Sequence, residues 1–156
     1  MRTLTCTVTA NADIDTVFDH LSDLTTMTTW DPRVTRVERR SGDGGPGSTW
    51  TCVLFHLGRP TTMTYTMVSL RRPHEIQWVG RSRYLTQRDV LRLEHHPWDR
   101  TGVECQSTFC YPALSGTSEG LLTLPLRHLC DRRQRGLQTA LDDLTRVRPV
   151  PRDTPA

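Results

Sequence analysis

The feature that most constrains the fold of this chain is a run of short, strand-like segments that ends in one change of hydrophobic period. Between Val34 and Tyr111, segments rich in β-branched and aromatic residues alternate with turn signals such as Gly42–Gly47 and Arg72–His74. Short connections join neighbouring antiparallel strands, because a parallel pair needs a crossover of about a dozen residues or more. The predicted strands of this run span 34–40, 48–57, 61–70, 75–81, 84–94 and 102–111.

Further elements flank this run on both sides. Residues 2–10 alternate apolar side chains with threonines and predict a first strand, and 14–21 carry the stripe of an amphipathic helix. After Pro112, leucines recur at helical spacing, and a helix over 125–147 would be roughly 34 Å long, enough to cross a domain. We therefore predict an α+β fold, in which a seven-stranded curved antiparallel sheet wraps around a long C-terminal helix and short helices follow the first strand.

The length and the end of the chain suggest its domain organisation. A chain of 156 residues fits one domain, which we place at residues 1–147. Residues 148–156 contain three prolines and are expected to form a disordered tail.

The basic residues exclude several classes of enzyme. All 20 of them are arginine, and the chain has no lysine. Schiff-base and pyridoxal chemistry need a lysine amine, and the phosphate loop of nucleoside triphosphatases needs its Gly-Lys-Ser/Thr. The arginines are scattered and the net charge is only +3, which argues against a nucleic-acid-binding surface.

The cysteines and the hydropathy pattern indicate where the protein works. Its five cysteines form no CxxC pair, so free thiols in a reducing compartment are the expected state. The first residues lack the apolar core of a signal peptide, and no run approaches the ~18 apolar residues of a membrane span. We expect a cytoplasmic protein, either a monomer or a homodimer.

Three motifs have simple structural interpretations. Gly116–Gly120 matches G-x-S-x-G, but a nucleophile elbow needs an acid and then a histidine after the serine, whereas here His128 precedes Asp131. Ser118 is therefore expected to cap a helix. The glycine cluster at 42–47 joins two strands and has no lysine, so it is a hairpin loop. The six histidines show no HxH or HExxH spacing, and we expect no metal and no cofactor.

Strand alternation predicts which side chains line the concave face of the sheet. Apolar walls with a few polar groups are typical of a small-molecule pocket, and so many polar groups on a buried face favour a cavity. The other interpretation, a filled core in which His56 and Tyr65 only satisfy hydrogen bonds, stays open. Segment 48–57 is apolar on both faces, so its phase is the least secure. The predicted rows are Trp50, Cys52, Leu54 and His56; Met63, Tyr65 and Met67; Ile76, Trp78 and Gly80; Leu85, Gln87, Asp89, Leu91 and Leu93; and Val103, Cys105, Ser107, Phe109 and Tyr111.

Five short motifs within this order of elements carry a family resemblance. They are Val17–Leu21, Trp30-Asp31-Pro32, Gly47–Trp50, Thr64–Met67 and Arg72-Pro73. With them the chain resembles the polyketide cyclase/dehydrase branch of the START-like (SRPBCC, helix-grip) superfamily. The resemblance implies a hydrophobic, polyketide-like ligand held between the sheet and the C-terminal helix. The residues expected to contact it are Trp30, Trp50, Leu54, Met67, Trp78, Gln87, Ser107, Phe109, Tyr111, Leu126 and Leu129.

The resemblance implies an enzyme that cyclises a polyketide intermediate, for which the chain offers few ionisable groups. His56 is the expected proton carrier, and Asp89 would either orient it or act itself, while Tyr65 or Tyr111 would donate to a developing oxyanion. The aromatase/cyclase relatives carry arginine in the pocket, and here only Arg83 or Arg133 could fill that role.

A non-catalytic carrier of a lipid, quinone or other hydrophobe is the alternative function. A hydrogen bond between His56 and Asp89 would favour the enzyme over the carrier. A partner-binding relative of the same fold stays open as a third possibility.

Overall fold

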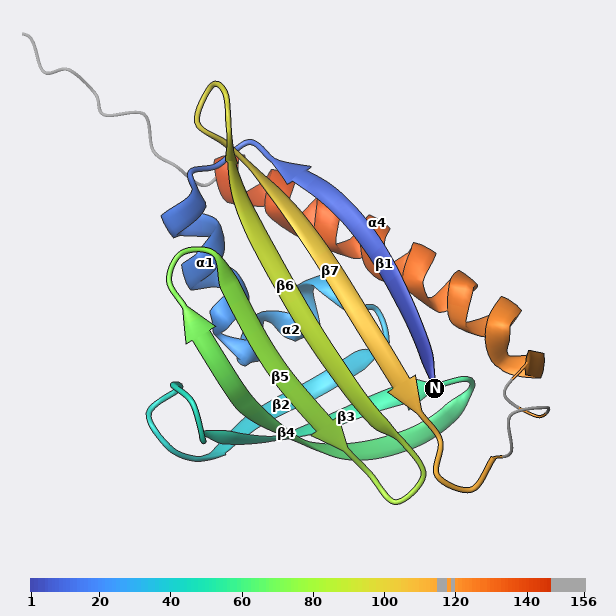
Figure 1. The fold of residues 1–156 in the computed structure, drawn as a ribbon. Helices are drawn as coiled ribbons and strands as arrows, with labels where there is room; N and C mark the ends of the chain where they lie inside the picture. Colours follow the sequence, from blue (N-terminus) through green and yellow to red (C-terminus); the bar gives the residue numbers. More distant parts are fainter. Residues whose placement is uncertain (115–117, 119, 147–156) are drawn as a thin grey trace, which may run out of the picture.

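A seven-stranded antiparallel sheet forms the body of the molecule in the computed structural model, which describes residues 1–114, 118 and 120–146 (Figure 1). The strand order is β1-β7-β6-β5-β4-β3-β2, so the six strands of the central run are joined as sequential hairpins and β1 pairs with the last of them. The predicted sheet is confirmed. Its strands are β1 (Arg2–Ala10), β2 (Val34–Ser41), β3 (Thr49–His56), β4 (Arg59–Arg71), β5 (Glu75–Arg81), β6 (Thr86–His96) and β7 (Arg100–Cys110).

Short helical segments follow β1 and bring the chain under the sheet. Helix α1 (Ile14–Ser22) begins where the Asp13 carboxylate accepts a hydrogen bond from the backbone N–H of Thr16, as an N-cap does. A 3-10 turn η1 (Leu24–Thr26) leads into the short helix α2 (Met27–Trp30). Helix α2 stops at Trp30 because the proline two residues later cannot continue a helix.

The long helix α4 (Thr123–Arg146) crosses the concave side of the sheet and runs beside β1 (Figure 1). It follows a 3-10 turn η2 (Gly120–Leu122) and begins two residues before the predicted start, since a proline is tolerated in the first turn of a helix. The side chains of Gln134 and Gln138 donate to the backbone carbonyls of Thr7 and Thr9 at 2.9 and 2.8 Å. Helix α4 thereby covers the outer edge of β1, which is the first strand in the order of the sheet. None of the helices in the described ranges has the length and apolar character needed to cross a membrane.

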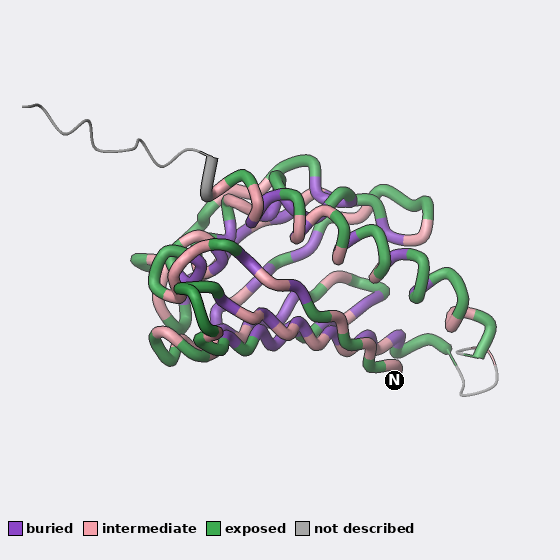
Figure 2. Tube along the Cα trace, turned by 90° about the horizontal axis from the view of Figure 1, so that it is seen from above, coloured by how far each residue is buried: buried purple, intermediate pink, exposed green. Residues whose placement is uncertain are grey.

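The core lies between the concave face of the sheet and the helices (Figure 2). Every residue of the predicted inner rows is buried, and the phase of β3 is the predicted one, because His56 is buried while Phe55 is half exposed. On α4 the buried stripe includes Leu126, Leu129 and Leu137. The fold thus places the polar inner residues where α4 can meet them.

The contact between α4 and the end of α2 is so close that only glycine fits there. A Cβ atom added at Gly136 would lie 2.3 Å from the carbonyl oxygen of Trp30, a backbone atom that cannot move aside alone. Gly136→Ala should therefore lower the free energy of unfolding by about 1–3 kcal/mol, as overpacking does. In an unobstructed helix the same change stabilises by about 0.5–1 kcal/mol.

Urea denaturation of Gly136→Ala measures this effect, with Thr139→Ala, at an exposed position of α4, as the matched control. The control should stay close to wild type. A Gly136→Ala protein as stable as the wild type would contradict the close packing of α4 on α2.

Candidate functional site

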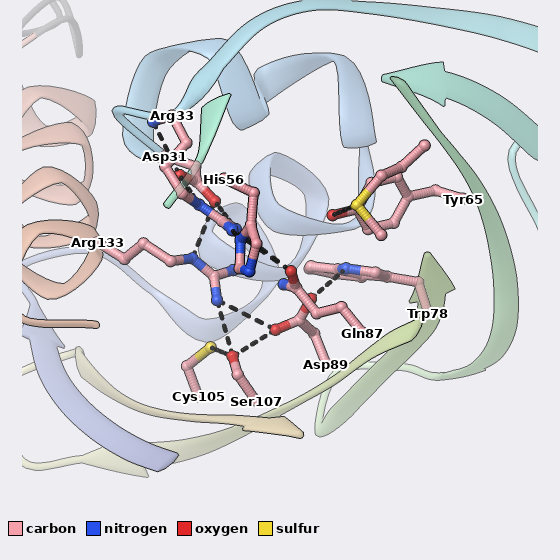
Figure 3. A network of polar contacts seen from close by, with 11 residues as sticks. Asp31, Arg33, His56, Tyr65, Trp78, Gln87, Asp89, Cys105, Ser107 and Arg133 are labelled. Atoms are coloured by element: carbon pink, nitrogen blue, oxygen red, sulfur yellow. Dashed lines mark hydrogen bonds and ion pairs between the residues drawn. The ribbon is translucent and has the colours of Figure 1, made fainter. Parts of the chain in front are cut away.

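Four charged side chains meet in the interior between the sheet and α4 (Figure 3). Asp31 and Arg33 come from the segment between α2 and β2, Asp89 comes from β6, and Arg133 comes from α4. All four are at most 6% exposed. Two positive and two negative groups balance one another, which is the condition under which buried charges are tolerated.

Asp31 and Arg33 form a two-pronged ion pair at one end of this network. The Arg33 guanidinium donates through Nε to Asp31 Oδ1 at 3.1 Å and through Nη2 to Oδ2 at 2.9 Å. Arg133 Nε lies 2.9 Å from the same Oδ2. Burial opposes ionisation of Asp31, but the charges of Arg33 and Arg133 outweigh it and lower the pKa of this carboxyl to about 2.

Asp89 is surrounded by donors at the other end of the network. Its Oδ2 accepts from Trp78 Nε1 at 2.9 Å and from Gln87 Nε2 at 2.7 Å. Its Oδ1 accepts from Arg133 Nη1 at 3.2 Å and from the Ser107 hydroxyl. Four donors saturate the carboxylate, so Asp89 anchors α4 to the sheet and has no lone pair directed toward a ligand.

His56 connects the network to Tyr111. Arginine can only donate, so the 3.1 Å contact from Arg33 Nη1 makes His56 Nδ1 an acceptor. The proton of the neutral ring is then on Nε2, which donates to Tyr111 Oη at 2.6 Å. Burial and then the charge of Arg33 lower the pKa of His56 to about 4. At neutral pH His56 is an uncharged hydrogen-bond donor whose two ring nitrogens are both engaged.

Two open pockets border these hydrogen-bonded arginine, histidine and tyrosine side chains, and both have Leu57 in their walls. One, of about 300 Å³, has His56 and Tyr111 in its wall and is otherwise mostly apolar. The other, of about 370 Å³, lies between α4 and the start of β2 and contains Arg33 and Leu129. The first is lined by His56, Leu57, Arg59, Pro60, Thr61, Ser82, Tyr84, Leu85, Tyr111, Ala113, Leu114 and Leu122.

The structure brings three of the predicted site residues to these two pockets, namely His56, Tyr111 and Leu129. The space under the middle of the sheet is filled by the charged network and its neighbours. Trp30 and Ser107 border only a crevice of about 10 Å³ beside β1, and Trp50 borders a surface hollow near the Gly42–Gly47 loop. The other predicted site residues are buried outside both pockets: Leu54, Tyr65, Met67, Trp78, Gln87, Asp89, Phe109 and Leu126.

The expected contact between His56 and Asp89 is replaced by an indirect one. Among the described residues, Arg33 donates to both His56 and the Gln87 side-chain oxygen, and Gln87 donates on to Asp89. The sign that would have favoured the enzyme over the carrier is therefore not observed. Asp89 is two hydrogen bonds away from the arginine that holds His56.

Tyr65 does not line either pocket, and of the two candidate pocket arginines only Arg133 points inward. The Tyr65 ring fills the space beside Gly80, where an added Cβ would lie 2.7 Å from it, and its hydroxyl contacts Met63 Sδ at 3.9 Å. Arg83 is exposed and stacks on Tyr84, whereas Arg133 points inward. The arginine that the sequence did not reveal is Arg33. It lies in the irregular segment after Trp-Asp-Pro, where neither helical nor strand periodicity assigns a side chain to a face.

Two other expectations concern motifs outside this network. Within the described part of the chain, no group of three histidine, cysteine or acidic side chains is arranged to hold a metal ion. Most of the Gly116–Gly120 motif lies outside the described residues, so the proposed helix cap at Ser118 stays a prediction.

Comparison with known proteins extends these observations. Residues 1–146 match the family model for polyketide cyclase / dehydrase and lipid transport. The chain belongs to this family. No curated protein sequence gives a significant match.

Solved structures confirm the helix-grip fold of this family member. The Zhui aromatase/cyclase from a Streptomyces species has a TM-score of 0.75 at 18% identity, covering 95% of this chain and 96% of that one. A START superfamily protein from Mycobacterium smegmatis has a TM-score of 0.65 at 15% identity, covering 88% and 97%. Ara h 8.0201 has a TM-score of 0.69 at 13% identity, covering 94% and 99%. At these identities the likeness shows the fold alone.

The charged network predicts strong coupling between Arg133 and Asp89. Arg133→Met leaves Asp89 without its buried positive partner and should cost about 3–5 kcal/mol of stability. Asp89→Asn should also destabilise, because its new amide group faces donors. The double variant removes one charge of each sign, so its cost should be at least about 1 kcal/mol less than the sum of the two.

Urea denaturation of the four proteins measures this cycle, and Arg92→Met serves as the control because its ion pair with Glu104 is on the surface. The control should change stability by no more than about 1 kcal/mol. Additive costs for the two buried substitutions would show that the pair does not act as a unit.

Proposed function

We propose that this protein binds a hydrophobic small molecule carrying a carbonyl group in the pocket lined by His56 and Tyr111. We further propose that it acts there as a cofactor-independent cyclase/dehydrase-like enzyme on a polyketide-like substrate. The observation that carries the proposal is the hydrogen-bonded chain from Arg33 through His56 to Tyr111, which leads from a buried charge to the wall of a mostly apolar pocket.

The hydrogen bonds from Arg33 through His56 to Tyr111 are suited to stabilise negative charge on a ligand oxygen. A guanidinium that donates to one nitrogen of an imidazole polarises the ring and makes the N–H on its other side a stronger donor. The His56 N–H in turn strengthens the donor ability of the Tyr111 hydroxyl, to which it donates. In a low-dielectric pocket, preorganised donors directed at a carbonyl favour the enolate that forms in aldol ring closure. The proposed role of the pair is therefore electrophilic.

The same geometry argues against the expected role of His56 as proton carrier. Its Nδ1 accepts from Arg33, its Nε2 already bears the proton, and burial lowers its pKa to about 4. A base at neutral pH would need a vacant lone pair and a pKa nearer 7. In our proposal, rate enhancement comes from holding one conformer of a reactive chain and from stabilising its enolate.

A carrier without chemistry is the second candidate, and one observation favours it. Among the described residues that line the His56–Tyr111 pocket, none is an aspartate or a glutamate. Proton abstraction next to a carbonyl then depends on water or on the substrate itself. In a carrier, the His56–Tyr111 pair would only anchor a polar group of the cargo.

Binding of the carbonyl can be tested with two probes of similar shape, 2-acetylnaphthalene and 2-ethylnaphthalene. The wild type should bind the ketone about 5–10-fold more tightly, the equivalent of one net hydrogen bond of about 1 kcal/mol. Tyr111→Phe should remove this preference while leaving the affinity for 2-ethylnaphthalene unchanged. Fluorescence titration measures both constants. Equal affinities of the wild type for the two probes would contradict a carbonyl site at Tyr111.

The location of the site needs a separate pair of variants. Ala113→Trp adds bulk to the pocket wall away from the buried charges, and it should abolish binding of both probes. Thr62→Trp adds the same bulk at an exposed position of β4 and should leave binding unchanged. If both variants still bind the probes, the ligand occupies another place.

Enzyme and carrier are separated by product formation from a poly-β-keto thioester. If the protein is an enzyme, Tyr111→Phe should slow cyclisation by about 10²-fold, the usual contribution of one oxyanion donor. If it is a carrier, the wild type should bind the thioester, but product should form no faster than it does in buffer without protein.

A further inference from the structure

Three cysteines gather at the seam between β1 and α4, away from the proposed ligand pocket. Cys6 on β1 and Cys105 on β7 are directly opposite one another in the strand register. Cys130 on α4 borders the same crevice of about 10 Å³, as does Arg133. Cys6 and Cys130 are partly exposed and Cys105 is buried. This cluster plays no part in the function proposed above.

The register alone brings Cys6 and Cys105 within disulfide range. Directly opposite residues of an antiparallel pair have Cα atoms about 4.5–5.5 Å apart and side chains on the same face. Disulfides span Cα distances of about 4.4–6.8 Å. A bond between the two sulfurs therefore needs little movement of the backbone, although both thiols are free in this structure.

We propose that Cys6 and Cys105 are a reversible, hydroperoxide-sensitive dithiol in which Cys6 is the attacking thiolate and Cys105 the resolving thiol. The proposal goes beyond ligand binding and assigns a modification site to the β1–β7 edge of the sheet.

Several observations assign the two roles. A hydrogen bond from Cys105 lowers the pKa of the Cys6 thiol to about 7; burial, Asp89 and Asp131 oppose this shift, and the nearby Arg133 charge adds to it. The pKa of Cys105 is raised, since it gives that hydrogen bond and is buried. Burial raises the pKa of Cys130 to about 11, although Arg133 lies close. Cys6 is therefore both partly exposed and the most acidic of the three thiols.

The chemistry is balanced with a hydroperoxide as the oxidant. The Cys6 thiolate attacks one peroxide oxygen, the O–O bond breaks, and Cys6 becomes a sulfenic acid while hydroxide leaves. Cys105 sulfur then attacks the Cys6 sulfur and displaces the OH group as water, once the Cys105 proton has been transferred. In sum, two thiols and one hydrogen peroxide give one disulfide and two waters. A dithiol reductant reverses the oxidation by exchange.

A disulfide between Cys6 and Cys105 would affect both the edge of the sheet and the buried charged network. The bond would join β1 covalently to β7, in addition to the backbone ladder that already pairs them. The Cys105 sulfur lies 3.9 Å from the hydroxyl of Ser107, which donates to Asp89. Only Ser107 therefore lies between the Cys105 sulfur and Asp89, one of the buried charges that anchor α4.

The test treats the intact protein with hydrogen peroxide, alkylates the remaining thiols under denaturing conditions, and measures mass and linked peptides. The oxidised wild type should carry two alkyl groups fewer than the untreated protein and yield a peptide pair joined through Cys6 and Cys105, and dithiothreitol should restore both thiols. In Cys105→Ser the sulfenic acid should persist and be trapped by dimedone on Cys6. The matched control is Cys110→Ser, a half-buried thiol on the opposite face of β7, which should behave as the wild type does.

A second measurement does not depend on the variants folding. In the untreated wild type at pH 7, Cys6 should be alkylated about 10-fold faster than Cys110. Equal rates would contradict the assignment of Cys6 as the thiolate. A disulfide that joins Cys6 to Cys130, or oxidation that reaches Cys110 first, would also overturn the proposal.

Discussion

The structure depends on a buried network of two aspartates and two arginines. In it Arg33 pairs with Asp31, and Arg133 pairs with both Asp31 and Asp89. Placing four charges in an interior would cost many kcal/mol if any one of them were left alone. Arg133 lies between the two carboxylates, 2.9 Å from Asp31 and 3.2 Å from Asp89. It therefore ties three parts of the fold to one another: the segment after α2, strand β6 and helix α4. The position of the long helix follows from this electrostatic requirement as well as from its leucine stripe.

The network also determines where a ligand can be held. Charged and hydrogen-bonded side chains fill the space under the middle of the sheet, so the two pockets beside the Arg33–His56–Tyr111 hydrogen bonds lie toward the end of the molecule where β3 meets β4. Arg33 belongs to both regions, because it pairs with Asp31 in the interior and donates to His56 in the pocket wall. The hydrogen-bonding state of the pocket is thereby set by the same ions that hold the fold together. A substitution in the network should change both stability and ligand recognition.

Periodicity was sufficient to predict the order of strands and helices and the inner faces of strands β3 to β7. The alternation in β3 placed His56 inward, and the helical spacing of leucines placed Leu126 and Leu129 against the sheet, because both patterns express a regular backbone. Two aspects of the site lay beyond that reasoning. Arg33 follows a proline in an irregular segment, so no period assigns it to a face. The partners of Asp89 depend on how far the Gln87 and Arg133 side chains reach across the interior, and strand phase carries no information about such distances.

The central claim is that Arg33 holds His56 as a neutral ring with its proton on Nε2, and an NMR titration of the His56 ring nitrogens tests it most directly. We predict a protonated Nε2 and an unprotonated Nδ1 from pH 8 down to about 5, with the second proton binding only near the lowered pKa of about 4. Replacing Arg33 with methionine should raise this pKa, since the guanidinium charge contributes to its lowering. A His56 ring that becomes doubly protonated near its ordinary pKa of about 6.5, or that carries its single proton on Nδ1, would contradict the account.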